Sequence, residues 1–216
     1  TLDIAHRAAP LIARELGIAT LLTRDGDEYV PLDERTARAN AFQADLFISI
    51  HCNAAESPER RGVMTFVLDE SGDAWASHIA ARENAASPAA AAELANVLSR
   101  IRDAGNVARC VELAELLQRA TIASLEADYP DVADRGVRRG GFYVLAGAHM
   151  PAVLFEATFI SHPLGELLEP GNGERERALP VPAPGARDLD TGARALSPAA
   201  SGPFAALLLA ARATRP

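Results

Sequence analysis

The sequence predicts an α/β fold: a mixed, largely parallel central sheet flanked by helices, in a single domain. Two apolar runs carry this prediction, because residues 46–50 lead into His51 and residues 151–155 lead into Glu156. Runs of about five apolar residues are typical of strands that are buried on both faces of a parallel sheet. Ligands of open α/β sheets bind at the carboxyl ends of strands, so we expect His51 and Glu156 to face one crevice.

The remaining elements follow from periodicity and turn signals. Apolar residues at helical spacing predict a helix over 2–16, closed by a left-handed Gly17, and a second helix over 32–44 that begins with Pro31. Further strands are expected at 18–24, 62–68, 142–145 and 152–157, and the pattern over 75–129 is helical with interruptions.

The length of 216 residues suits one well-buried core. Residues 1–168 are expected to form this domain. Seven of the 14 prolines lie beyond Glu169, among Gly, Ala and Arg, so residues 169–216 are expected to be a disordered or weakly packed tail.

Charge and hydropathy exclude several classes of partner. The formal net charge is −8 without any Lys/Arg block, which argues against a nucleic-acid partner. No apolar run approaches the roughly 20 residues that a membrane-spanning helix needs, and residues 1–20 do not read as a signal peptide. The two cysteines are too few for a disulfide framework or a thiolate zinc site.

The candidate site residues each have a structural and a functional interpretation. His51 is either a hydrogen-bonded structural histidine or a metal ligand. Glu156 is either a buried carboxylate paired with an arginine, for example Arg135, or a catalytic group. Asn53 either contacts substrate or forms a turn after the strand. The residues alone leave these alternatives open.

Several segments, in order along the chain, carry a family resemblance. They are Leu22-Thr23-Arg24, Ala39-Asn40, residues 44–53 (ADLFISIHCN), residues 81–85 (ARENA), residues 134–137 (DRGV), residues 142–145 (FYVL) and residues 150–161 (MPAVLFEATFIS). Together they resemble the zinc-dependent N-acetylmuramoyl-L-alanine amidases of the AmiA/AmiB/AmiC type, over residues 1–168. Any one segment is weak evidence, but their shared order makes the resemblance specific.

The resemblance implies a cell-wall hydrolase that cuts the amide between N-acetylmuramic acid and L-alanine in peptidoglycan. It implies zinc as the cofactor, with His51 as a zinc ligand, Glu156 as the catalytic carboxylate and Asn53 as a candidate substrate contact. It also implies a periplasmic or secreted location, and it leaves open a regulatory protein partner.

The sequence departs from the family pattern at its beginning. The family places a first zinc histidine in a Gly-rich loop after its first strand, and a Glu ligand shortly before the helix that starts here at Leu2. Neither motif is present, so we expect the family's first strand to be missing and only one of the three protein ligands that catalytic zinc takes to be recognisable. Two expectations follow: a fragment of an active amidase, or a non-catalytic homologue that binds peptidoglycan or regulates. A nucleotide-binding protein is disfavoured, because no Gly-x-Gly-x-x-Gly or Gly-Lys-Ser/Thr loop follows a strand.

Overall fold

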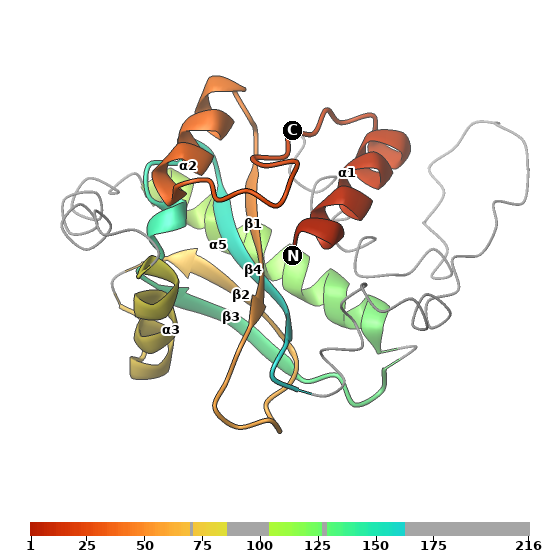
Figure 1. The fold of residues 1–216 in the computed structure, drawn as a ribbon, viewed down its shortest axis with the longest axis vertical. Helices are drawn as coiled ribbons and strands as arrows, with labels where there is room; N and C mark the ends of the chain where they lie inside the picture. Colours follow the sequence, from red (N-terminus) through yellow and green to blue (C-terminus); the bar gives the residue numbers. More distant parts are fainter. Residues whose placement is uncertain (70, 86–103, 127–128, 163–216) are drawn as a thin grey trace, which may run out of the picture.

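The computed structural model describes residues 1–162, except 70, 86–103 and 127–128. Figure 1 shows the elements along the chain. The helices are α1 (Leu2–Leu16), α2 (Leu32–Ala41), α3 (Ala74–Asn84), α5 (Ala104–Leu125) and the short 3-10 helix η1 (Tyr143–Leu145). The strands are β1 (Phe47–Asn53), β2 (Val63–Leu68), β3 (Asp134–Gly140) and β4 (Ala152–Phe159). The tail expected at 169–216 lies outside the described residues.

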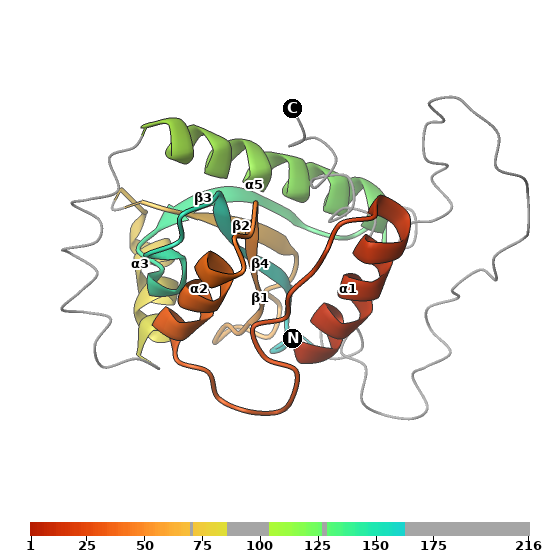
Figure 2. The same ribbon diagram turned by 90° about the horizontal axis from the view of Figure 1, so that it is seen from above.

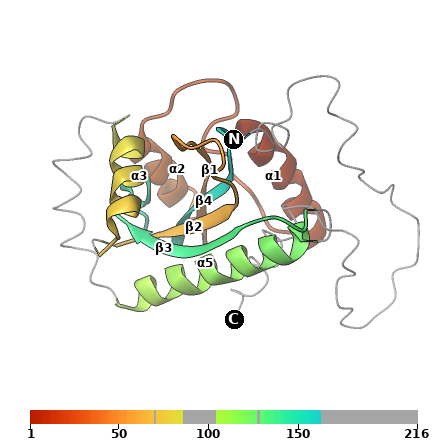
Figure 3. The same cartoon turned by 90° about the horizontal axis from the view of Figure 1, so that it is seen from below.

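The four strands form one sheet in the order β1-β4-β2-β3. Strand β1 is parallel to β4, β2 is parallel to β3, and only the central β2–β4 pair is antiparallel. Seen from above and below in Figures 2 and 3, α5 covers one face of the sheet, α2 and α3 cover the other, and α1 lies beside β1. The prediction of a mixed, largely parallel α/β domain is confirmed.

Each face of the sheet has its own apolar core. The core under α5 joins α5 to Val63 of β2 and to Val153 and Phe155 of β4. The core on the other face joins α2, α3 and η1 to residues of alternate strand positions, including Phe66 and Leu154. Because side chains alternate along a strand, β4 places Leu154 and Glu156 on the same face, under α3.

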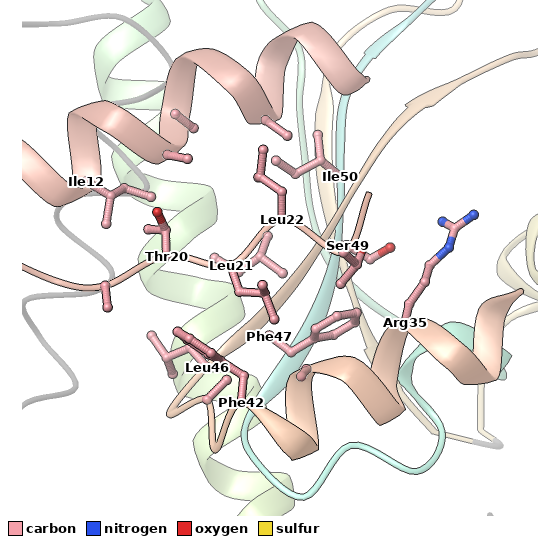
Figure 4. A pocket seen from close by; sticks show the side chains of 18 of the residues that line it. Ile12, Thr20, Leu21, Leu22, Arg35, Phe42, Leu46, Phe47, Ser49 and Ile50 are labelled. Carbon is pink, nitrogen blue, oxygen red and sulfur yellow. The ribbon is translucent and has the colours of Figure 1, made fainter. Parts of the chain in front are cut away.

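The predicted helix over 2–16 is confirmed as α1, and Gly17 closes it with φ 65°. The strand expected at 18–24 is wrong: that segment has no strand structure. The physical reason is the lack of a neighbour, since β1 pairs with β4 along one edge and with no described strand along the other. A cavity of about 700 Å³ lies between α1, residues 18–24 and this free edge of β1. Figure 4 shows Leu21 pointing toward Phe47 in this cavity and Leu22 pointing toward α1.

Two further expectations are corrected. Residues 142–145 form the 3-10 helix η1 rather than a strand, because Leu145 and Ala146 bond back to the carbonyls of residues 142 and 143. The strand that completes the sheet is β3, whose sequence DRGVRRG gave no apolar alternation. Arginines are compatible with β3 because it is an edge strand with one half-exposed side. Helix α2 also ends three residues early, at Ala41, with Gln43 at φ 55°.

A buried polar residue fixes α5 to the sheet edge. The side-chain amide of Gln118 donates to the Val63 carbonyl (3.0 Å) and to Asp134 Oδ1 (2.6 Å), and its oxygen accepts from Thr65 Oγ1 (2.9 Å). All three partners lie on β2 or β3, so α5 sets the position of these strands. In the described part of the chain, no helix is long and apolar enough to cross a membrane.

Gly62 lies where β2 begins, and we expect Gly62→Ala to destabilise the fold strongly. Its φ is +116°, and an added Cβ would lie 2.1 Å from the Ala133 carbonyl oxygen. Strain and overpacking together predict a loss of more than about 2 kcal/mol in the free energy of unfolding, measured by urea denaturation. Gly26→Ala is the matched control, because nothing lies within 4 Å of its Cβ position. Equal stability of the two variants would contradict this account of β2.

Candidate metal and catalytic site

The structure brings His51 and Glu156 together at the carboxyl ends of two neighbouring strands. The two residues are direct partners in the register of the parallel β1–β4 pair. A third residue, Glu83 from the last turn of α3, joins them. His51, Glu83 and Glu156 each offer one ligand atom, and these atoms all lie within 4.8 Å of one another. We call these three residues the candidate metal site; it is the only group of its kind among the described residues.

His51 is held by contacts on both ring nitrogens. Its Nδ1 lies 3.0 Å from Glu83 Oε2, and its Nε2 lies 3.2 Å from Ser49 Oγ. A hydrogen on Nδ1 donated to Glu83 leaves Nε2 to accept from the Ser49 hydroxyl. The hydrogen bond from His51 is the largest influence that lowers the pKa of Glu83; Arg82 acts in the same direction, and burial opposes the shift. Glu83 is therefore an anion that faces an imidazole.

Glu156 has the opposite environment. Its side chain is fully buried, and neither carboxyl oxygen has a hydrogen-bond partner among the described residues. Burial is the main cause that raises the pKa of Glu156 to about 8; the charge of Glu83 acts in the same direction, and that of Arg82 opposes the shift. The proposed ion pair with Arg135 is not formed, since that guanidinium lies over the ring of Phe159 instead. Two carboxyl groups with pKa values pushed apart are typical of sites that do acid–base chemistry.

Arg82 and Asn84 fix the end of α3 over the cluster. Arg82 donates to the Ala54 carbonyl (2.7 Å) and to Asn53 Oδ1 (3.2 Å). Asn84 donates to the Gly141 carbonyl (2.8 Å) and accepts from the amide of Tyr143 (2.9 Å). These four bonds span from β1 to η1. They hold Glu83, which lies between the two side chains in the sequence, against His51.

Asn53 is fully buried at the end of β1, and its side chain supports Arg82. Its expected contact with substrate stays a prediction. Glu83 was not among the sequence candidates, although it lies in the ARENA segment of the family resemblance. Its helical context gave no chemical signal, because an exposed Glu near a helix end is common, and only the fold shows that α3 ends over His51.

The donor set fits a divalent transition metal. Imidazole and carboxylate are ligands that zinc takes in proteins, whereas calcium and magnesium prefer oxygen ligands alone. The two oxygens of Glu156 are buried and have no hydrogen-bond partner among the described residues, so they fit a site that takes a cation and its water. Ser49 also lines the cavity beside β1, so that cavity reaches the residue that contacts His51.

The fold and the site together define an α/β domain with a cluster of one histidine and two glutamates, able to hold a metal ion, at the carboxyl edge of its parallel strands. The chain belongs to the N-acetylmuramoyl-L-alanine amidase family, whose model matches residues 1–167. It is 32% identical over 169 residues to N-acetylmuramoyl-L-alanine amidase AmiA of Escherichia coli, covering 73% of this chain and 56% of that protein. It is 30% identical over 173 residues to AmiC of E. coli, covering 74% of this chain and 39% of that one.

The chain thus spans about half the length, or less, of these curated relatives. Among solved structures, an N-acetylmuramoyl-L-alanine amidase from Clostridium difficile has a TM-score of 0.53 at 25% identity, covering 76% of this chain and 68% of that one. The CwlD amidase from Clostridioides difficile, solved in complex with the GerS lipoprotein, has a TM-score of 0.58 at 17% identity, covering 98% and 82%. The second likeness shows the fold alone.

We expect the buried carboxyl group of Glu156 to make the metal-free protein less stable as the pH rises. A folded-state pKa above the unfolded value means that stability is full below pH 4.5 and is lost as the pH rises through about 8. We therefore expect the free energy of unfolding of Glu156→Gln to rise relative to that of the wild type across this pH window, by up to about 5 kcal/mol. Urea unfolding with EDTA present measures this difference.

Glu59→Gln provides the control for this experiment, because Glu59 is exposed. Its stability should follow that of the wild type at every pH. A difference between Glu156→Gln and wild type that is the same at pH 4 and pH 9 would contradict the raised pKa.

Proposed function

We propose that this domain hydrolyses the amide between N-acetylmuramic acid and L-alanine in peptidoglycan, with zinc held at His51 and Glu83 and with Glu156 as general base. The observation that carries the proposal is the convergence of one imidazole and two carboxyl groups, one of them buried without a partner, at the carboxyl ends of β1 and β4. The family match supports the choice of bond, since the relatives are named for this amidase activity. A periplasmic or secreted location follows from the position of such a substrate outside the cytoplasm.

His51 and Glu83 are the residues that would hold the metal. Ser49 fixes the ring of His51 from the other side, and the two bonds of Arg82 fix the helix end that carries Glu83. When bound, zinc lowers the pKa of a water ligand to about 7 and polarises the substrate carbonyl. An amide is a poor electrophile, so this activation and a base are both required.

Glu156 is suited to carry the proton. In the metal-free protein its pKa of about 8 lies close to neutral pH, where a group both accepts and releases a proton readily. Glu156 would take the proton from the attacking water at a carboxyl oxygen and give it to the alanine nitrogen as the amide breaks. Burial on the strand keeps this carboxyl group away from bulk water, and its place in β4 beside β1 keeps it next to His51.

Labelled peptidoglycan and zinc analysis test these roles separately. We expect His51→Ala to lose both bound zinc and release of labelled stem peptide, because it removes a ligand. Glu156→Gln should keep zinc but lower release at least about 100-fold, because it removes only the base. His78→Ala is the matched control: it removes an exposed histidine of α3 and should behave as the wild type.

The assay is run on this chain and on the chain extended by whatever residues its gene encodes before Thr1. Undiminished release by both His51→Ala and Glu156→Gln would reject the assigned roles. Binding to insoluble peptidoglycan without release at any zinc concentration, in both forms of the wild type, would instead identify a non-catalytic homologue.

A further inference from the structure

Three arginines form a cluster beside the candidate site that the mechanism above does not use. Arg135 and Arg138 lie on β3, and Arg60 lies in the segment before β2. The guanidinium carbons of Arg60 and Arg138 lie 5.4 Å and 5.2 Å from the ring centroid of Trp75. That of Arg135 lies 5.4 Å from the ring centroid of Phe159. We call Arg60, Arg135 and Arg138 the arginine cluster.

The arginine cluster holds more positive than negative charge. Asp73 pairs with Arg138 at 2.6 Å, but no carboxylate of the described residues lies within 4 Å of Arg60 or Arg135. Burial lowers the pKa of Arg135, and the charges of Arg60 and Arg138 lower it further. The Nε atom of Arg138 is buried and has no hydrogen-bond partner among the described residues.

Neighbouring acids do not relieve this excess. The carboxylate of Asp134 accepts from Gln118 and from the amide of Gly136, and Asp69 pairs with Arg139. A chain with a formal net charge of −8 thus concentrates uncompensated guanidinium groups at one edge of its sheet. Like charges held close together destabilise the fold unless an anion comes to them.

The arginine cluster and the candidate metal site share one face of the sheet. Phe159, which Arg135 covers, belongs to the core on the α3 face and pairs with Asn53 at the end of β1. Glu156 precedes Phe159 on the same strand. Trp75, which Arg60 and Arg138 cover, lies on α3, the helix that carries Glu83. The apolar core closes the α3 face itself, but Arg60 and Arg135 lie at the starts of β2 and β3, beside the end of β4, because Val63 pairs with Asp134 and Met64 with Glu156. A substrate with its scissile amide at the candidate metal site can therefore reach these arginines along this edge of the sheet.

We propose that the arginine cluster binds a free carboxylate of the stem peptide, on the alanine side of the scissile amide. This inference rests on the proposed function. Guanidinium groups bind carboxylates through paired N–H bonds, and stacking on an aromatic ring leaves the N–H edge of the guanidinium open. Arg135 Nε donates to the Arg61 carbonyl (2.6 Å), so the terminal N–H groups of Arg135 and the guanidinium of Arg60 are the donors for the ligand. The peptide side of the substrate carries carboxylates, whereas the amide-linked sugar does not, so the cluster also fixes which way the substrate lies.

A matched pair of soluble probes tests this proposal. The first is an N-acetylmuramoyl dipeptide whose second residue has a free α-carboxylate, and the second is its α-carboxamide. We expect the wild type to bind the carboxylate at least 10-fold more tightly, by calorimetry, and to show the same ratio in KM where it cleaves them. Arg60→Gln and Arg135→Gln should each bring this ratio near one. Arg119→Gln, which removes an exposed arginine of α5, should keep it. Thermal melting confirms that each variant folds.

The binding arm does not need catalysis, so the two proposals fail separately. A preference for the carboxylate without cleavage supports the arginine cluster and rejects the proposed function. Cleavage with equal affinity for both probes overturns the arginine cluster and leaves the proposed function standing. A preference that survives in both folded variants, Arg60→Gln and Arg135→Gln, also overturns it.

Discussion

The site depends on one constraint: the carboxyl group of Glu156 is fully buried in a strand, and neither of its oxygens is hydrogen-bonded to any residue that the structure describes. An ionised carboxylate in such a place costs several kcal/mol, so the group keeps its proton to a higher pH than usual. Proteins retain such a cost where it serves a task. The neighbouring residues indicate which task, because the carboxylate of Glu83 and the imidazole of His51 lie within 4.8 Å of the Glu156 carboxyl group.

The two carboxyl groups differ because of the elements that carry them. Glu156 is part of a central strand, and packing over the sheet face to which its side chain projects excludes water from it. Glu83 lies at the end of a helix, where His51 and Arg82 lower its pKa. The sheet thus holds a group that keeps a proton, and the helix holds one that keeps a negative charge. Separating these roles between two elements allows each carboxyl group to be tuned by its own surroundings.

The free edge of β1 shows that strand-like composition alone does not make a strand. Residues 18–24 have strand-like composition but remain irregular, because a strand needs a hydrogen-bonding neighbour and the free edge of β1 lies across a cavity. On the opposite edge, β3 forms despite its three arginines, because β2 and Gln118 supply partners for its backbone and for its first residue. Pairing partners, more than composition, decided which segments became strands.

This difference sets what the sequence could predict. Continuous apolar runs identified β1 and β4, and the polar residues that end them identified His51 and Glu156. Glu83 and the arginine cluster were out of reach, because nothing local distinguishes them from surface charges. Their positions near the site become visible only in the fold, where α3 lies over the end of β1 and β3 pairs with β2. The segments of the family resemblance contained Glu83 and Arg135, but gave neither residue a role.

The most direct test of this account is the titration of Glu156 itself, followed by ¹³C NMR of selectively labelled carboxyl groups in the metal-free protein. We predict a midpoint near pH 8 for the resonance that disappears in Glu156→Gln. Addition of zinc should shift that resonance and lower its midpoint, because a cation beside the carboxyl group favours its ionised form. A midpoint below pH 5 without metal, unaffected by zinc, would contradict the central claim that an unpartnered carboxyl group stands at a metal site.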